Sequence, residues 1–346
     1  MPDHPPRRRG APFLLLIGAV VIAVGIVIAL SAGKSDALVV YCAHDAVYAE
    51  SVLRDFERRS GIPLAIRYDS EATKSLGLVE QLLSEKDNSR CDVFWNNQAM
   101  GTQRLKEAGV LQAYKGSGYA RIPAAFKDPE GCWTGFGARL RVYIINTERM
   151  PATEEAVTEK LAGNLDRVAM AKPLYGTTYV HYCALWSLLG EEELKRLHAD
   201  WRARNVVEAT GNAHCKNLVA SGVCDLAWTD TDDFFLAVDE GKPVAMLPVR
   251  IGGGKTICSP NTVCIIKGTR REPQAQQLVE YLLSEETKIG LANASSRQIP
   301  LGPVDESRIP EEVRTLKSWA ADACPLSNVM RAAPDCLAWL KAEYVQ

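Results

Sequence analysis

Three carboxylates lie within four residues of the chain, at Asp230, Asp232 and Asp233. They follow an apolar run at 226–228 and precede a second apolar run that begins at Phe234, a pattern typical of a buried strand, a turn and a helix start. In an open α/β sheet, such turns form the crevice where ligands bind. The carboxylates therefore either cap a helix and favour its positive end, or line a ligand cleft.

A second group with chemical potential is Gly176-Thr177-Thr178, which opens an apolar helical run extending to about residue 189. A helix start leaves backbone N–H groups unpaired, and the two hydroxyls stand beside the positive end of the helix. This combination suits an anion, such as a phosphate or carboxylate group. Ordinary helix capping is the alternative interpretation.

Catalytic signatures are missing from the sequence. His44, Asp45 and His181 could act as bases, but there is no G-x-S-x-G elbow, no H-E-x-x-H and no His/Cys cluster with metal-ligand spacing. The segment 252–256 ends like a phosphate-binding loop, but Val249 stands where that motif needs glycine, so we interpret it as a turn. We predict no enzymatic activity and keep an exported hydrolase only as an alternative.

Strand and helix patterns alternate through the first part of the chain. We expect strands at 38–42, 63–68 and 91–95, and helices at 46–60, 75–85 and 101–108. This βαβαβα order predicts a parallel sheet, and hence an α/β fold. The loops after its strands carry polar residues that would meet at one edge of the sheet, namely Asp45, Thr73 and Asn97.

A length of 346 residues allows about two domains or lobes. The segment 132–146 is punctuated by glycines and then strongly β-forming, and it is long enough to leave one lobe and enter another. We expect lobe 1 at 38–140 and 263–303, lobe 2 at 141–262, and a helical C-terminal extension at 304–346.

The first 33 residues predict a signal or membrane anchor. Residues 13–30 are eighteen apolar or small residues without a charge, preceded by three arginines at 7–9. A run of this length can span a bilayer, and the arginines favour export of everything after it. Residues 29–31 resemble a processing site, so both a cleaved and an anchored form stay open. The expected location is periplasmic or extracytoplasmic.

All ten cysteines lie beyond the apolar run. An even number in an oxidising compartment favours disulfides over metal thiolates. The near-neighbour candidates are Cys215 with Cys224, Cys258 with Cys264, and Cys324 with Cys336. The alternative is that several, such as Cys183, are buried thiols.

The net charge of −2 gives no indication of the basic surface that nucleic-acid-binding proteins use.

Several segments together resemble a known family, and they span about 38–303. They are Leu38-Val-Val-Tyr41, Asp92-Val-Phe94, the run from Gly135 to Val142, Gly176-Thr-Thr178 and Pro260-Asn-Thr-Val263. This combination is similar to the extracytoplasmic solute-binding proteins of ABC importers, in the branch that includes ferric-ion-binding and 2-aminoethylphosphonate-binding proteins. The resemblance implies a type II periplasmic-binding-protein fold, in which two lobes joined by two crossing strands close over a ligand. It also implies a monomer that hands its ligand to a permease of the inner membrane.

The resemblance can be carried to individual positions. Ferric-ion binders use a His in the first loop, a Glu after the third strand and paired Tyr after the Asp-turn strand. At the corresponding positions this chain has Asp45, Asn97 and the carboxylates at 230–233, and the loss of the tyrosine pair argues against tyrosinate iron binding. Arg139 and the helix start at 176–178 match the family's anion-binding elements. The resemblance therefore implies an oxyanion-bearing or zwitterionic solute, with a phosphonate-like group on Arg139 and an amine on the aspartates.

The alternatives are a ferric ion with an anion, and a membrane-tethered sensor that uses the same module. No resident cofactor is expected, because iron would be the ligand. The candidate ligand-binding residues are Asp45, Thr73, Asn97, Arg139, Gly176, Thr177, Thr178, Asp230, Asp232 and Asp233.

Overall fold

The computed structural model describes residues 37–69 and 76–345. The predicted anchor at 1–33 and the candidate residue Thr73 lie outside the described residues. Among those that are described, no helix is both long and apolar enough to cross a membrane.

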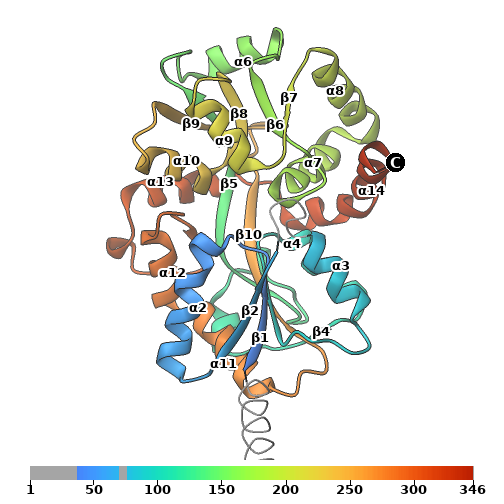
Figure 1. Cartoon of the computed structure of the whole chain (residues 1–346), viewed down its shortest axis with the longest axis vertical. Helices are drawn as coiled ribbons and strands as arrows, with labels where there is room; N and C mark the ends of the chain where they lie inside the picture. The colour runs from blue at the N-terminus through green and yellow to red at the C-terminus, as the bar shows by residue number, and fades with distance from the viewer. Residues whose placement is uncertain (1–36, 70–75, 346) are drawn as a thin grey trace, which may run out of the picture.

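Two α/β lobes stack along the long axis of the molecule (Figure 1). The strands of lobe 1 lie in the order β2 (Leu64–Tyr68), β1 (Leu38–Cys42), β3 (Val93–Asn96) and β10 (Cys258–Ile266), with the short β4 (Leu111–Gln112) paired to β10. β1 runs parallel to both β2 and β3, as the alternating pattern predicts, whereas β10 is antiparallel to β3. The ends of β1 and β3 consequently meet at one edge of the sheet.

Lobe 2 repeats this plan with different strands. They are β8 (Leu226–Asp230), β6 (Val168–Ala171), β7 (Val207–Ala209) and β9 (Val244–Pro248). β6 is parallel to β7 and β8, so the carboxyl ends of these three strands also converge.

β5 (Thr134–Asn146) links the two sheets. It pairs with β10 in the lobe-1 sheet up to Leu140 and with β8 in the lobe-2 sheet from Arg141. Every residue of β5 except Tyr143 is buried. Arg139 and Arg141 therefore flank the point where the chain passes from one sheet to the other.

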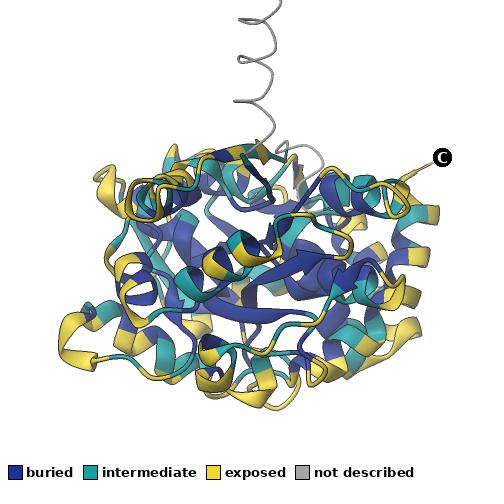
Figure 2. Ribbon diagram, turned by 90° about the horizontal axis from the view of Figure 1, so that it is seen from below, coloured by how far each residue is buried: buried dark blue, intermediate teal, exposed yellow. Residues whose placement is uncertain are grey.

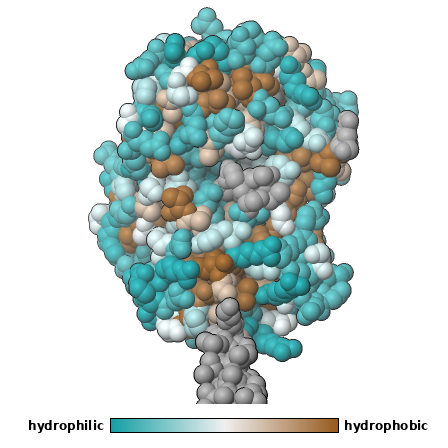
Figure 3. Space-filling view, viewed as in Figure 1, coloured by the Kyte–Doolittle hydropathy of each residue, from teal (hydrophilic) through white to brown (hydrophobic). Residues whose placement is uncertain are grey.

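Helices cover the sheets, and Figure 2 shows buried strands inside a shell whose exposed residues lie on the outer helix faces. Lobe 1 carries α2 (Ala46–Ser60), α3 (Leu76–Ser84), α4 (Ala99–Glu107), α5 (Ser117–Arg121), α11 (Glu272–Leu282) and α12 (Glu285–Asn293). Lobe 2 carries α6 (Glu154–Ala162), α7 (Gly176–Leu189), α8 (Glu191–Ala203), α9 (Asn212–Ala220) and α10 (Thr231–Asp239). On the face seen in Figure 3, hydrophilic residues predominate and hydrophobic residues form small groups.

The C-terminal segment crosses between the lobes. After β11 (Ile299–Pro300) and α13 (Glu311–Ala320), α14 (Leu326–Tyr344) packs along α7 of lobe 2. Tyr179 of α7 donates a 2.7 Å hydrogen bond to the carbonyl of Ala333, and Lys341 lies 3.3 Å from Glu80 of lobe 1. The C-terminal segment is therefore largely helical and contacts both lobes.

The structure holds all ten cysteines as free thiols, so the predicted disulfides are not present. Cys258 and Cys264 are the first and seventh residues of one extended strand, about 20 Å apart. Cys324 precedes α14, whereas Cys336 stands ten residues beyond the first residue of that helix, about 15 Å along its axis. Cys336 instead contacts the thiol of Cys183 on α7. The unbonded pairs are Cys215 with Cys224, Cys258 with Cys264, and Cys324 with Cys336.

A buried lysine fixes the segment that follows β11. Lys288 of α12 is 1% exposed, and its Nζ donates hydrogen bonds to the carbonyls of Leu301, at 3.1 Å, and Pro303, at 3.4 Å. Burial, with a smaller contribution from the charge of Arg121, lowers the pKa of Lys288 from 10.5 to about 8.

Between pH 8 and pH 10.5, Lys288 is expected to add a rising contribution to the free energy of unfolding, whereas the buried cysteines and tyrosines, whose pKa values burial raises, add a falling one. In this window the unfolded chain keeps a proton that the folded chain has lost at Lys288, so a higher pH favours the folded state. We expect this contribution, about 3 kcal/mol for the shift from 10.5 to about 8, to appear as the difference between wild type and Lys288→Met when urea unfolding is measured across the window. Lys242→Met, at an exposed position, is the control and should keep the wild-type pH profile. A Lys288→Met chain with the wild-type slope would contradict the assignment.

Candidate functional site

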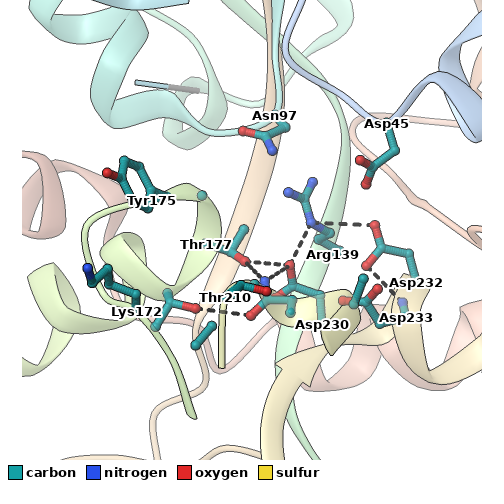
Figure 4. Close-up of a pocket in the computed structure, with 16 residues that line it drawn as sticks. Asp45, Asn97, Arg139, Lys172, Tyr175, Thr177, Thr210, Asp230, Asp232 and Asp233 are labelled. Carbon is teal, nitrogen blue, oxygen red and sulfur yellow. Dashed lines mark hydrogen bonds and ion pairs between the residues drawn. The ribbon is translucent and has the colours of Figure 1, made fainter. Parts of the chain in front are cut away.

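One pocket lies where the two lobes face each other (Figure 4). Its lining includes every candidate ligand residue that the structure describes. These are Asp45, Asn97, Arg139, Gly176, Thr177, Thr178, Asp230, Asp232 and Asp233.

Lobe 1 contributes residues that follow its central parallel strands. Asp45 precedes α2, in the loop after β1, and Asn97 directly follows β3. Because these two strands are parallel neighbours, their loops lie side by side. His44, next to Asp45, is not among the lining residues; its ring stacks on Trp95, 5.6 Å between centroids.

The start of α7 forms another wall of the pocket. Gly176 has a φ of +54°, a conformation that glycine adopts without strain, and the helix begins there. The two hydroxyls that follow already have protein partners. Thr177 donates to a carboxylate oxygen of Asp230, and Thr178 donates to Asn212 at 3.0 Å. The sequence correctly placed these residues at a helix start but did not indicate these partners.

Asp230 lies at the centre of a hydrogen-bonded network. Its carboxylate accepts from Arg139 Nε at 3.0 Å, Arg141 Nη1 at 2.8 Å and Asn212 Nδ2 at 3.1 Å, in addition to Thr177. It occupies the N-cap position of α10, yet its side chain makes no capping hydrogen bond. Burial opposes its charge, but the two guanidinium groups outweigh this and lower the pKa of Asp230.

Asp232 and Asp233 occupy the first turn of α10. Asp232 Oδ2 lies 3.6 Å from Arg139 Nε, and its other oxygen accepts the N–H of Asp233 at 3.1 Å. Asp233 also accepts from the hydroxyl of Thr229 at 2.8 Å. One oxygen each of Asp230, Asp232 and Asp233 lies within 4.8 Å of the others, close enough to hold a metal ion.

Arg139 is less available to a ligand than the sequence suggested. It is 3% exposed, with Nε on Asp230 and Nη1 on Asn261 at 3.3 Å. Coulombic attraction to Asp232 and Asp230 outweighs burial and raises its pKa, so it stays charged. Figure 4 shows the outer nitrogens of the guanidinium directed towards Asn97 across the pocket.

Sequence reasoning missed part of the lining. Lys172 follows β6, and Thr210 and Asn212 follow β7, so all three stand at strand ends like the residues that were found. Their position at strand ends could therefore have identified them, but the sequence analysis did not select single polar residues in these loops. The other missed lining residues are Ala171, Gly211 and Ala213.

The family of the chain follows from a model match over residues 38–292. That model describes bacterial extracellular solute-binding proteins, and the chain belongs to this family. The expected class, an extracytoplasmic solute-binding protein of an ABC importer, is confirmed at this level. Binding of small solutes or metal ions, not catalysis, is the activity of the family.

Individual relatives are distant. The chain is 23% identical to iron uptake protein A2 of Synechocystis over 246 residues, 66% of this chain and 70% of the relative. Iron-bound HitA from Pseudomonas aeruginosa is 20% identical, with a TM-score of 0.75, and the match covers 89% of this chain and 99% of HitA. The periplasmic binding protein AfuA from Actinobacillus pleuropneumoniae, with fructose-6-phosphate bound, is 18% identical, with a TM-score of 0.70 and coverage of 89% and 97%. These likenesses establish the two-lobe fold.

Proposed function

We propose that this protein captures a small zwitterionic, oxyanion-bearing solute between its lobes and delivers it to an ABC permease of the inner membrane. The observation that carries the proposal is an interlobe pocket into which both lobes send charged and polar side chains. Membership of the family supports the transport role, and the charges lining the pocket support the chemical class of the solute.

The two charges of the solute have separate partners in this proposal. Asp45, Asp232 and Asp233 lie on one side of the pocket and suit an ammonium group. Lys172 and the start of α7 lie on the other side and suit a phosphonate or carboxylate group. The outer nitrogens of Arg139, between the two sides, complete the site. An aminoalkylphosphonate has this charge pattern.

Closure of the lobes supplies the binding mechanism. β5 and β10 pair with each other next to the point where β5 enters the second sheet, so bending there would bring Asp45 and Asn97 towards the lobe-2 residues. A solute that contacts both lobes favours the closed form, because it gains contacts that the open form lacks. The permease would then recognise the closed form.

A ferric ion is the second candidate ligand. The favouring observation is the group of three carboxylates at 230, 232 and 233, together with Tyr175 in the same pocket. Carboxylate oxygens suit hard cations. Two similar proteins are named for iron, an iron uptake protein of Synechocystis and an iron-bound protein of Pseudomonas aeruginosa. Against iron, Asp230 is already held by two arginines.

A melting-temperature and calorimetry screen of the full-length protein in detergent tests the proposal. The probes are 2-aminoethylphosphonate, ethylphosphonate, inorganic phosphate, small carboxylates, and ferric ion with and without carbonate. A ligand at one hundred times its Kd stabilises by about 2.7 kcal/mol, which a melting curve resolves. We expect the aminoalkylphosphonate to give the largest shift. If ferric ion were the only probe that stabilised the protein, iron would replace the zwitterion as the proposed ligand.

Replacing Arg139 with alanine is expected to weaken aminoalkylphosphonate binding by about 1.5–3 kcal/mol, the value of a charge-assisted hydrogen bond. Calorimetry measures the change. Arg202→Ala is the control, because this exposed arginine pairs with Glu343 on the outer surface. Equal affinities of Arg139→Ala and wild type would remove Arg139 from the site.

A further inference from the structure

The groups around the Asp230 carboxylate are those that a protein uses to bind a free oxyanion. Two guanidinium groups, a hydroxyl and a side-chain amide donate to it, from Arg139, Arg141, Thr177 and Asn212. Guanidinium groups pair well with carboxylate and phosphate oxygens because their N–H donors match the spacing of those oxygens. In this chain these donors surround the carboxylate of Asp230, which belongs to the protein itself.

We propose that Asp230 is an internal anion that determines specificity, occupying the oxyanion position between Arg139 and Arg141 so that no anion from solution binds there. The anionic group of the solute is then received by Lys172 and the start of α7. The part that concerns the solute rests on the proposed function. The exclusion of free anions rests on the geometry of Asp230 alone.

Burial makes the exclusion effective. Asp230 is 3% exposed and Arg141 is completely buried, so a dissolved anion could reach this position only by displacing the carboxylate. Displacement would leave Asp230 charged and without partners in a dry environment, which is strongly unfavourable.

Arg141 depends on this carboxylate in particular. Its Nη1 contacts Asp230, Asn212 and Thr177, whereas its Nε and Nη2 have no hydrogen-bond partner among the described residues. Asp230 is the one acidic residue of the described chain that forms an ion pair with Arg141. A vacancy at Asp230 would therefore leave a buried positive charge that attracts a replacement anion.

Chemical rescue of Asp230→Ala tests the proposal. The substitution removes a carboxylate and keeps Cβ, so formate matches the lost group in charge and size. Melting temperatures of the full-length protein are measured against formate concentration, with chloride at equal ionic strength. We expect the variant to melt several degrees lower in chloride and to regain much of that loss saturably in formate. Wild type should show no such response.

Asp225→Ala provides a matched control at the other end of β8. Asp225 also accepts from two basic side chains, Arg167 and Lys160, each at 2.8 Å, but near the surface. Formate should not rescue this variant. Equal rescue of both variants, or an Asp230→Ala chain that formate neither stabilises nor helps to fold, would overturn the proposal.

A second measurement does not depend on how Asp230→Ala folds. Inorganic phosphate is titrated into wild type, Lys172→Met and Arg141→Met. Saturable binding that survives in Lys172→Met and is lost in Arg141→Met, at a temperature where a melting curve shows both variants folded, would overturn the proposal, since phosphate would then occupy the position assigned to Asp230. Binding that is absent, or lost only in Lys172→Met, supports it. Failure of every zwitterion to bind would remove the proposed solute but leave the formate result standing.

Discussion

The Arg141→Met variant is expected to lose about 3–5 kcal/mol of unfolding free energy, the typical cost of removing one partner from a buried ion pair. Arg141 is completely buried and contacts Asp230, Asn212 and Thr177 through one nitrogen. Methionine fills much of the space but provides no hydrogen-bond donor. Of the two described cations that pair with Asp230, Arg139 alone would remain.

Urea unfolding with a constant m-value measures this loss. Arg167→Met is the matched control, because Arg167 makes an equally short ion pair with Asp225 but has a half-exposed side chain. Exposed pairs contribute about 0–1 kcal/mol, so the control should unfold close to wild type. Equal losses in both variants would mean that the Arg141 network adds no more stability than a surface ion pair.

The fold was predictable because strand and helix periods are local properties of the sequence. The predicted helix at 46–60 coincides with α2, and the predicted strand at 63–68 differs from β2 by one residue. The parallel order of the first three strands follows from alternation, because a helix between two strands returns the chain to the same edge. That rule also explains why Asp45 and Asn97 meet in one pocket.

The internal partners of the site residues were not predictable in the same way. Arg139 and Asp230 are 91 residues apart, and no local period specifies which carboxylate a buried arginine will meet. The sequence therefore offered Arg139 to a ligand, although the fold gives its Nε to Asp230. The disulfide predictions were wrong for a related reason. Close spacing along the chain brings two thiols together only across a turn, whereas Cys258 and Cys264 share one extended strand.

Asp232→Asn tests the partner proposed for the ammonium group. Asp232 is 4% exposed and lines the pocket beside Arg139. The substitution keeps the size of the side chain and removes its charge. Truncating one partner of a buried, hydrogen-bonded charge pair typically costs about 2–5 kcal/mol of binding free energy. We expect a loss of about 2–3 kcal/mol for 2-aminoethylphosphonate, at the lower end of that range because the amide still accepts a hydrogen bond.

Ethylphosphonate separates this effect from general damage to the site, because it keeps the anionic group and lacks the amine. In wild type it should bind more weakly than 2-aminoethylphosphonate, and Asp232→Asn should bring the two affinities together. Asp239→Asn, at the other end of α10 in an exposed ion pair with Arg297, should leave both affinities unchanged. If Asp232→Asn weakens both phosphonates equally, Asp232 supports Arg139 and does not bind the amine. The ammonium group would then have to be assigned to Asp45 or Asp233, which line the same side of the pocket.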